Sequence, residues 1–454
     1  MNTNELLMEW SNLSLEEIEA RLQAAAAPGE GARDLAPASA GAQDAVDRIF
    51  GPEEAEELRA LAAQPQARGL LPSVVLLPGI MGSQLASVRG VTKLLWINPM
   101  IFLKGESSYL ELNEDGTDDR HPEIEAVATA VEKMTYLKIA LTLRREVDLY
   151  EFPYDWRRPI EESADLLHRT LERWSDGDPD RKFTLVGHSM GGIVSRAYLA
   201  RHPQDARRRI ERVIMHGSPQ FGAAQTIQNL IEGNRMMSIA GFLNSDNNTR
   251  RLLLNLPSVY QILPPPPDLF PGTRPYPADW DLYDADAWRL DGIRQDYLNA
   301  ARDFHELLAG VKDSEAAEVE VIQIAGCNLE TMVEARRRST DGDRWELEPM
   351  WMEEGPDSGD GTVPLWSALL PGATFYYVQE VHRDLPKNRD VRRATVELIH
   401  GGIPDLPTEL PKAKFGLFGR DALEPAEVEA ERLRRELETG NAGEEELANL
   451  FFAF

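Results

Sequence analysis

The sequence contains one cysteine, fewer basic than acidic residues and no long hydrophobic run, and each of these shortages excludes a class of protein. Cys327 has no second cysteine to pair with, so a disulfide-stapled fold is excluded. The 48 basic residues stand against 76 acidic ones, giving a formal net charge of -28, which repels nucleic acid and anionic membranes. No segment approaches the ~18 consecutive apolar residues of a membrane-spanning helix. The first residues, MNTNELLMEW, lack a basic region followed by an apolar run, so we expect no export signal and a cytoplasmic location.

Length and local composition predict one large domain with an extension at each end. The chain has 454 residues, of which 42% are hydrophobic, enough to bury a sizeable core. Residues 1–69 combine short helical patterns with a flexible small-residue linker, AAAAPGEGARDLAPASAGA. Residues 401–454 form an acidic helical tail, which we expect to be an appended interaction segment rather than part of the core. Either extension is therefore a candidate contact for a protein partner.

Residues 70–400 alternate short β-branched runs with helical periodicity, which is typical of an α/β fold with a mostly parallel sheet and helices on both faces. Six runs are predicted strands: SVVLLPG near residue 73, VDLYEFPYD near 147, FTLVGHS near 183, RVIMHGSP near 212, VEVIQIAG near 319 and ATFYYVQ near 373. Ligands of open α/β sheets bind outside the carboxyl ends of the strands, so the loops that follow these runs are the candidate site.

The stretch VGHSMGG, residues 186–192, places a serine on a tight strand-to-helix turn. The strand FTLV precedes it, and apolar residues at helical spacing follow it. In the pattern Gly-x-Ser-x-Gly the two glycines leave room for a crowded bend, which lifts the Ser189 hydroxyl clear of the sheet. The following helix favours negative charge near its first turn. Ser189 is therefore the candidate nucleophile, and a purely structural turn is the weaker alternative.

A serine nucleophile needs a base and an orienting carboxylate, which follow it in the order Ser, Asp, His in this fold. The segment DSGDGTVPLWSA places Asp360 in a glycine-flanked loop after a predicted strand, and VQEVHRDLPKN places His382 after the last one. His382 is predicted to deprotonate Ser189, and Asp360 to fix the tautomer of the imidazole. Asp357 is a weaker candidate for the carboxylate.

Two backbone amides are expected to stabilise the oxyanion of a tetrahedral intermediate. One is the amide of Met190, directly after the nucleophile. The other is expected in the loop LLPGIMGSQL, with Ile80 preferred and Met81 as the alternative. That loop lacks the Gly-Lys-Ser/Thr ending of a phosphate-binding loop.

Two further histidines lie near this edge of the sheet. His216 ends a predicted strand and is a candidate residue of the substrate pocket. His188 belongs to the elbow, but neighbouring residues point in different directions, so a direct role is not expected for it. The other five are expected to be surface or packing residues: His121, His168, His202, His305 and His400.

Two insertions, residues 86–135 and 222–310, are candidates to cap the pocket. The first contains NEDGTDDR, whose spacing misses the EF-hand calcium loop and favours a hairpin turn. The Met- and Leu-rich stretches of the second are as consistent with ordinary core as with a lipid-facing lid. Residues 331–349, TMVEARRRSTDGDRWELEP, predict an added hairpin around an Asp-Gly turn.

Five segments resemble the lecithin:cholesterol acyltransferase family and stand in its order: LLPGIMGSQL, FPYDWRRP, VGHSMGGIVSRAYL, GDGTVPLWS and VHRDLPKN. The resemblance covers residues 70–400 and implies an α/β-hydrolase fold, with Ser189, Asp360 and His382 as the triad. It also implies that Met190 and the region of Ile80 form the oxyanion hole. By the same resemblance the acyl pocket lies beside Asp155, Trp156 and Arg157, and Met81 is placed with these pocket residues. Secreted animal members have a signal peptide and a disulfide-held lid, and we expect neither in this chain.

The sequence therefore predicts a serine-dependent hydrolase or acyltransferase of lipid-like esters, working through an acyl-enzyme without a metal or cofactor. Contact with a lipid surface is expected to be transient, because the chain is acidic. Two alternatives stay open. One is a catalytically silent α/β-hydrolase scaffold that recruits a protein partner. The other is a hydrolase of small soluble esters or amides, which the same triad permits.

Overall fold

A computed structural model describes residues 3–26, 45–89, 92–270, 280–313, 315–339, 345–413, 424–443, 446–447 and 450–451. Its centre is a six-stranded sheet of order β11-β8-β7-β6-β1-β5, in which every neighbouring pair is parallel. All six strands predicted from the sequence are confirmed. Their bounds are β1 Ser73–Leu77, β5 Asp148–Glu151, β6 Phe183–His188, β7 Ile210–His216, β8 Glu320–Gly326 and β11 Thr374–Val378.

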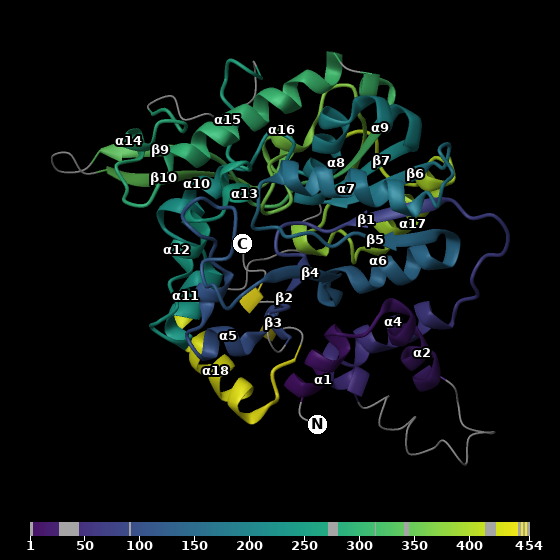
Figure 1. The fold of residues 1–454 in the computed structure, drawn as a ribbon, viewed down its shortest axis with the longest axis horizontal. Helices are drawn as coiled ribbons and strands as arrows, with labels where there is room; N and C mark the ends of the chain where they lie inside the picture. The colour runs from purple at the N-terminus through teal and green to yellow at the C-terminus, as the bar shows by residue number, and fades with distance from the viewer. Residues whose placement is uncertain are drawn as a thin grey trace.

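Helices cover both faces of this sheet (Figure 1). On one face lie α6 (Lys133–Glu146) and α17 (Arg389–Ile399), and on the other lie α7 (Ile160–Trp174), α8 (Met190–Arg201), α9 (Pro203–Arg209) and α15 (Gln295–Ala309). In α7 the buried residues Ile160, Ala164, Leu167 and Leu171 recur at helical spacing, so one stripe faces the core. The sheet between two helical layers confirms the predicted α/β-hydrolase fold class.

The order of the strands creates a crevice at the end of β1 and β6. The chain leaves β1 toward β5 at one edge, whereas it leaves β6 toward β7 in the opposite direction. Loops that diverge in this way leave space above the two carboxyl ends, which is where ligands bind in such sheets. Helix α8 starts at this point and lies very close to β1, since a Cβ on Gly191 would lie 2.3 Å from the carbonyl oxygen of Leu77.

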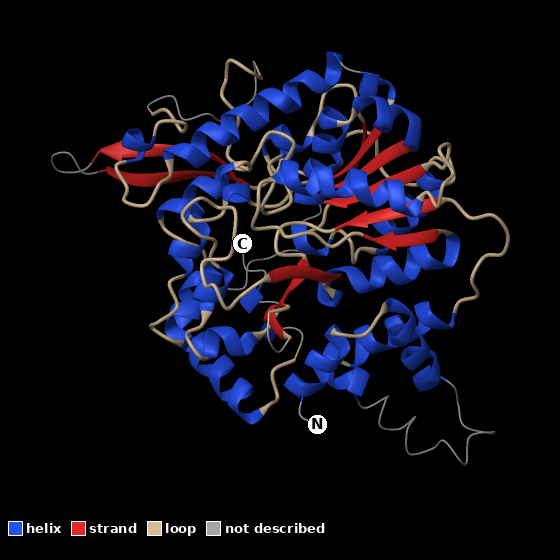
Figure 2. Cartoon of the chain, in the orientation of Figure 1, coloured by secondary structure: helices blue, strands red, loops and turns tan. Residues whose placement is uncertain are grey.

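The first insertion builds a small sheet of its own (Figure 2). Strands β2 (Ser83–Ser87), β3 (Lys93–Trp96) and β4 (Ala126–Val131) pair antiparallel in the order β3-β2-β4. Between β3 and β4 lie α5 (Pro99–Leu103) and η1 (Ser107–Leu110). The predicted hairpin turn in NEDGTDDR is confirmed, because Leu112 bridges Asp119 in antiparallel fashion.

The second insertion is helical, and its helices are α10 (Ala224–Ile231), α11 (Arg235–Leu243), α12 (Thr249–Leu254), α13 (Pro257–Tyr260) and α14 (Ala285–Trp288). The predicted hairpin after β8 is also confirmed: β9 (Thr331–Ser339) pairs antiparallel with β10 (Trp345–Met352). It projects from the body of the molecule (Figure 2). The Asp-Gly turn at its tip lies outside the described residues. The remaining elements are η2 Gly310–Asp313, η3 Glu315–Glu318, η4 Gly355–Asp357, α16 Leu365–Ala368 and η5 His382–Asp384.

The N-terminal extension packs on the α/β domain: α2 (Leu15–Ala26) and α4 (Pro52–Ala63) contact α6, and α1 (Thr3–Ser11) accepts the Gln84 side chain at the carbonyl oxygen of Ser11. Glu16 on α2 lies 2.9 Å from the guanidinium of Arg144, and Glu57 on α4 lies 2.8 Å from Lys138, both on α6. Residues 27–44, which hold most of the predicted linker, lie outside the described part of the chain.

The C-terminal helix α18 (Ala426–Thr439) corrects one prediction. Instead of an appended segment, it packs along α11, and its Leu433 and Leu437 belong to the main hydrophobic core. Phe451 also joins this core, with its ring 5.0 Å from that of Trp96. A stripe of apolar residues on a highly charged helix was sufficient for burial against α11. Among the described helices, none has the length and apolarity needed to cross a membrane.

Candidate active site

Ser189 occupies the turn between β6 and α8 in a strained backbone conformation. Its φ of 53° and ψ of -124° are rare for a residue other than glycine. The Ser189 amide donates to the carbonyl oxygen of His216 at 2.9 Å, which ties the turn to β7. A Cβ on Gly187 would lie 2.6 Å from the amide nitrogen of Gly192, so no larger residue fits there. The turn therefore has the geometry of the predicted nucleophile elbow.

The structure brings Ser189, His382 and Asp360 into one hydrogen-bonded chain. Nε2 of His382 lies 2.9 Å from the Ser189 hydroxyl oxygen, and its Nδ1 lies 2.7 Å from Oδ2 of Asp360. The carboxylate of Asp360 is 1% exposed, and its other oxygen accepts the amides of Thr362 and Val363 at 3.0 and 2.6 Å. Because a carboxylate only accepts, Nδ1 of His382 carries the proton, which leaves Nε2 to accept from the serine hydroxyl.

The carboxylate in contact with the imidazole is that of Asp360, and not that of Asp357. The amide of His382 also donates to the carbonyl oxygen of Asp360 at 2.8 Å, so the two loops are joined twice. Asp357 lies in η4, one turn earlier in the same loop. The geometry thus favours the preferred candidate.

The loop after β1 is held in place by aromatic side chains. Tyr154 donates its hydroxyl to the carbonyl oxygen of Pro78 at 2.7 Å, and the indole of Trp96 donates to that of Met81 at 2.7 Å. Within the described residues, the amide of Ile80 has no hydrogen-bond acceptor, and Ile80 lines the cavity beside Ser189. Met190 is the first residue of α8, so its amide has no acceptor in the helix. Both amides are available to an oxyanion.

Two residues that the sequence did not single out for the site connect this loop to the triad. The amide of Gly79 donates to the hydroxyl oxygen of Tyr136 at 2.7 Å, and that hydroxyl lies 2.7 Å from Nδ1 of His188. Nε2 of His188 lies 3.0 Å from the carbonyl oxygen of His382. A carbonyl only accepts, so Nε2 of His188 carries the proton and Nδ1 accepts a hydrogen bond from the Tyr136 hydroxyl.

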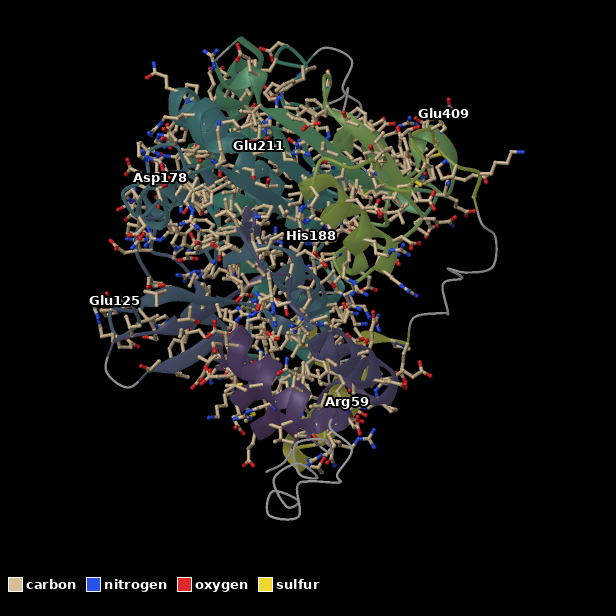
Figure 3. All side chains as sticks on the ribbon, turned by 90° about the vertical axis from the view of Figure 1, so that its right-hand side faces the viewer. Arg59, Glu125, Asp178, His188, Glu211 and Glu409 are labelled. Carbon is tan, nitrogen blue, oxygen red and sulfur yellow. The ribbon has the colours of Figure 1, made fainter. Side chains whose placement is uncertain are left out.

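His188 therefore connects the loop after β1, through Tyr136, to the backbone of His382, although the sequence predicts no direct role for it. Its side chain is buried near the middle of the molecule, whereas Asp178 and Glu409 lie at the periphery (Figure 3). Burial and the neighbouring His382 hold the pKa of His188 well below its usual value, so the imidazole is neutral. In the sequence, the only indication of a role for His188 is its position at the end of the strand before the elbow. No pattern in the sequence indicates its partner Tyr136, which is 52 residues away.

A mostly apolar cavity of about 120 Å³ opens beside the Ser189 hydroxyl. The second insertion supplies much of its wall through α10, α12 and the segment after them, so this insertion covers the site. The lining residues are Gly79, Ile80, Gly82, Glu132, Thr135, Tyr136, His188, Ser189, Pro219, Ala223, Gln225, Thr226, Asn229, Leu253, Val259, Ile262, Thr362, Val363, His382 and Arg383.

Glu132 supplies a carboxylate and Arg383 a guanidinium to the wall of the cavity, and the two side chains differ in burial. Glu132 is fully buried and accepts the amides of Met134 and Thr135 at the start of α6. Burial raises its pKa. Arg383 is partly exposed and follows the base directly. The carboxyl group of Glu132 is fixed by the first amides of α6, so it is a structural part of the cavity wall. Arg383 places a cation at the edge of the cavity.

The five residues predicted to form the substrate pocket do not line this cavity, which corrects that expectation. Arg157 is fully buried in ion pairs with Asp155 and Asp119, at 2.7 and 2.8 Å. The indole of Trp156 donates to the carbonyl oxygen of Ser83 at 3.1 Å. The PYDWR segment is thus part of the scaffold that holds the oxyanion loop and the first insertion, and not a wall of the pocket.

The remaining two predicted pocket residues are also buried elsewhere. The Met81 side chain is 0% exposed, with its backbone at a φ of 61°. His216 turns toward α17, where its Nε2 lies 2.9 Å from the hydroxyl of Thr395. Strand ends alternate their side chains between the two faces of a sheet, so a position near the site does not imply a side chain in it. No cluster of three or more metal-ligating side chains occurs among the described residues.

The parallel sheet, its two helical layers and the serine elbow at the crevice define the chain as an α/β-hydrolase. Residues 125–299 match the family model described as "Lecithin:cholesterol acyltransferase". The resemblance to this family predicted from the motifs is confirmed. The matched range contains Ser189 and the PYDWR segment but ends before Asp360 and His382.

A curated relative from Arabidopsis thaliana, "Lecithin-cholesterol acyltransferase-like 4", is 26% identical to the chain over 121 residues. The match spans 25% of this chain and 22% of that relative, about a fifth of the relative's length. Among solved structures, a chain of the Tle4-Tli4 complex is 14% identical, with a TM-score of 0.44, covering 73% of this chain and 98% of that one. The mature lipase BlEst2 of Bacillus licheniformis is 15% identical with a TM-score of 0.37, covering 74% and 94%.

Proposed function

We propose that this chain is a serine-dependent acyl hydrolase or acyltransferase that acts on lipid-like esters through a covalent acyl-enzyme. The observation that carries the proposal is the chain of contacts from Asp360 through His382 to Ser189, at 2.7 and 2.9 Å, at the mouth of an apolar cavity. The tautomer of His382 that Asp360 imposes is the one that accepts a proton from the serine. The resemblance to the lecithin:cholesterol acyltransferase family supports an acyl-ester substrate.

In the proposed reaction the Ser189 oxygen attacks the acyl carbon of the ester while Nε2 of His382 takes the hydroxyl proton. The carbonyl oxygen becomes an oxyanion, and the amides of Ile80 and Met190 donate to it. The carbon–oxygen bond to the leaving alcohol then breaks, and the imidazolium returns its proton to that alcohol. Water or a second alcohol attacks the acyl-enzyme by the same steps, with His382 as base and then acid.

The lining of the cavity supports an acyl chain as the buried part of the substrate. Leu253, Val259 and Ile262 come from the second insertion, and Ile80 and Val363 come from the loops around the triad. Apolar walls of this kind favour an alkyl chain because its transfer from water is favourable by about 0.8 kcal/mol for each buried CH₂ group. The proposal therefore predicts that activity rises with acyl chain length until the cavity is filled.

The experiment compares wild type and Ser189→Ala on nitrophenyl esters of two to sixteen acyl carbons, on neutral lipid and on phospholipid. Because the triad acts as a unit, Ser189→Ala should lower kcat by about 10⁶-fold while the folded structure is retained. Leu253→Trp should shift the preference toward shorter chains, whereas Leu252→Trp, at a buried position outside the cavity lining, controls for general disruption. Wild-type turnover by Ser189→Ala would refute the proposal. A product assay with added alcohol then decides between hydrolysis and transfer.

A further inference from the structure

A second cavity, away from the triad, is lined by an unusual number of arginines for a chain with a net charge of -28. Its volume is about 630 Å³, and it lies between the turn of the first insertion, α12 and the segment before α15. Four guanidinium groups and two carboxylates line it: Arg120, Arg250, Arg251, Arg294, Glu114 and Asp291. Four guanidinium groups in one concave site bring many N–H donors together.

Four carboxylates match the four guanidinium groups in number, since Glu114 and Asp291 line the cavity and Glu111 and Asp296 pair with its arginines, but they do not accept from every N–H donor. Glu111, which is buried, serves both Arg120 and Arg251, with an O–N distance of 3.3 Å to Arg251. Arg294 is held by Asp296 at 2.6 Å and lies over the ring of Tyr297. The side chain of Arg251 remains more than half exposed, and it lines the cavity. One carboxylate cannot satisfy ten guanidinium N–H donors, so donors are left for a ligand.

The guanidinium of Arg250 has two donor atoms that find no acceptor in the part of the chain that the structure describes. Its Nε and Nη2 atoms are buried, yet neither donates to an acceptor among the described residues. A buried charged donor without an acceptor is strongly unfavourable, which makes such a group an indication of a bound ion or water. The planar fork of arginine matches the oxygens of a phosphate group, which accept two parallel N–H bonds.

The helix α12 separates this cavity from the catalytic one. Arg250, Arg251 and Leu254 line the arginine cavity, whereas Leu253, between them in sequence, lines the cavity beside Ser189. A ligand that holds the arginines therefore also holds the helix that forms part of the acyl wall.

We propose that the arginine cavity formed by Arg120, Arg250, Arg251 and Arg294 is a binding site for a phosphate group, separate from the catalytic centre. The group is either a free phosphate anion or the phosphate of a lipid headgroup, which present the same oxygens to the arginines. Binding at this site needs none of the triad residues, so it is measured on Ser189→Ala and stands independently of the proposed esterase function.

The experiment follows thermal unfolding of Ser189→Ala while sodium phosphate replaces sodium chloride at constant ionic strength, because salt alone screens surface charge. A saturable rise in Tm is expected. Arg250→Gln should weaken phosphate binding by at least about tenfold, the value of one charge-assisted hydrogen bond, and so should Arg251→Gln. Arg207→Gln, at an exposed ion pair with Glu318 outside the cavity, should keep the wild-type response.

The unfolding temperature in sodium chloride without phosphate shows whether Arg250 binds a ligand or stabilises the fold. If Arg250 awaits a ligand, Arg250→Gln removes a buried unpaired donor and leaves Tm unchanged or higher. If Arg250 stabilises the fold, the variant unfolds at a lower temperature, and the proposal is wrong. The proposal also fails if phosphate gives no saturable shift and no vesicle binding, or if Arg250→Gln responds like wild type.

Vesicles distinguish the two sources of phosphate. In flotation assays, Ser189→Ala is mixed with vesicles of phosphatidylcholine or of a phosphate-free glycolipid. Binding to phosphatidylcholine alone, lost in Arg250→Gln and Arg251→Gln, assigns the site to a lipid headgroup. A phosphate-dependent Tm shift without vesicle binding assigns it to a soluble anion.

Discussion

The hydroxyl oxygen of Tyr136 lies 2.7 Å from Nδ1 of His188, although 52 residues separate them in the chain. The same hydroxyl accepts the amide of Gly79, and the other nitrogen of His188 lies 3.0 Å from the carbonyl oxygen of His382. One tyrosine thus connects the oxyanion loop, the elbow and the backbone of the base. We infer that Tyr136 and His188 are positioning residues for the reaction.

Tyr136→Phe should lower kcat by about tenfold with little change in KM, because the oxyanion donors lose their alignment while the acyl wall keeps its shape. The change also leaves a buried amide and a buried imidazole nitrogen without partners, which costs about 1–3 kcal/mol of stability each. Steady-state kinetics on a short ester measures the split. Tyr150→Phe, whose hydroxyl bonds to Asp148 at the sheet edge, is the control. Equal effects of the two variants would contradict a positioning role for Tyr136.

Asp360→Asn should fold but acylate about 10⁴-fold more slowly than wild type. One oxygen of Asp360 is fixed by two backbone amides, so the carbonyl of an asparagine remains there and its NH₂ group faces Nδ1 of His382. The imidazole then carries its proton on Nε2 and cannot accept from Ser189. Burst-phase kinetics reports acylation directly. Asp357→Asn should behave like wild type, and an equal loss in that variant would move the carboxylate role to it.

Gly217→Ala should disturb the triad itself. Gly217 has a φ of 57°, and an added Cβ would lie 2.6 Å from Leu385 and 2.9 Å from the carboxylate of Asp360. A change of this kind displaces Asp360 and should lower kcat by about 10- to 100-fold. Gly177→Ala carries the same backbone strain, at a φ of 78°, but with open space around it. Both variants should lose about 1–2 kcal/mol of stability through the backbone strain. Gly217→Ala should lose more because of its clashes, and it alone should lose activity.

The sequence was sufficient to predict those strands, hairpins and site residues that have a recognisable local pattern. The six apolar runs are the six strands of the sheet, the turn in NEDGTDDR forms where its residues indicate, and the two strands predicted within residues 331–349 pair as β9 and β10. The chain order Ser, Asp, His selected three residues that the structure places in contact. These features depend on near neighbours in sequence, which a pattern of residue types records directly.

Features that depend on contacts between distant segments were not predicted. The sequence predicts Trp156 and Arg157 at the pocket, but they contact Ser83 at the start of β2 and Asp119 in the first insertion. The C-terminal segment looked like a free charged tail, yet Phe451 lies against Trp96, more than 350 positions earlier in the sequence. These contacts join segments that are far apart in the sequence, so they can be recognised only once the arrangement of the segments in the fold is known.

His216 should make the stability of the protein depend on pH below neutrality. Burial lowers the pKa of His216 to about 4, from an ordinary value near 6.5. Its Nε2 bonds to Thr395. Its Nδ1 is buried, and no acceptor among the described residues could take a hydrogen bond from a protonated Nδ1. Above pH 6.5 His216 is neutral in both the folded and the unfolded chain, so its contribution to the free energy of unfolding is constant. As the pH falls from about 6.5 toward 4, the unfolded chain binds a proton that the folded chain does not, and stability decreases.

His216→Gln keeps a donor for Thr395 and removes this titration. Urea unfolding at pH 7 and pH 5 measures the free energy of unfolding in both proteins. Wild type should lose about 2 kcal/mol more than the variant over this interval. Other buried groups titrate in both proteins and cancel in the difference. Parallel losses in the two proteins would show that His216 is not held neutral in the folded state.

Covalent labelling with a fluorophosphonate, followed by peptide mass mapping, tests the central claim most directly. The reagent forms a stable adduct only with a serine that an adjacent base activates. We predict a single adduct on the peptide that contains Ser189, formed in wild type and Asp357→Asn and greatly slowed in Asp360→Asn. An unlabelled protein, or an adduct on any other residue, would contradict the assignment of Ser189 as the nucleophile.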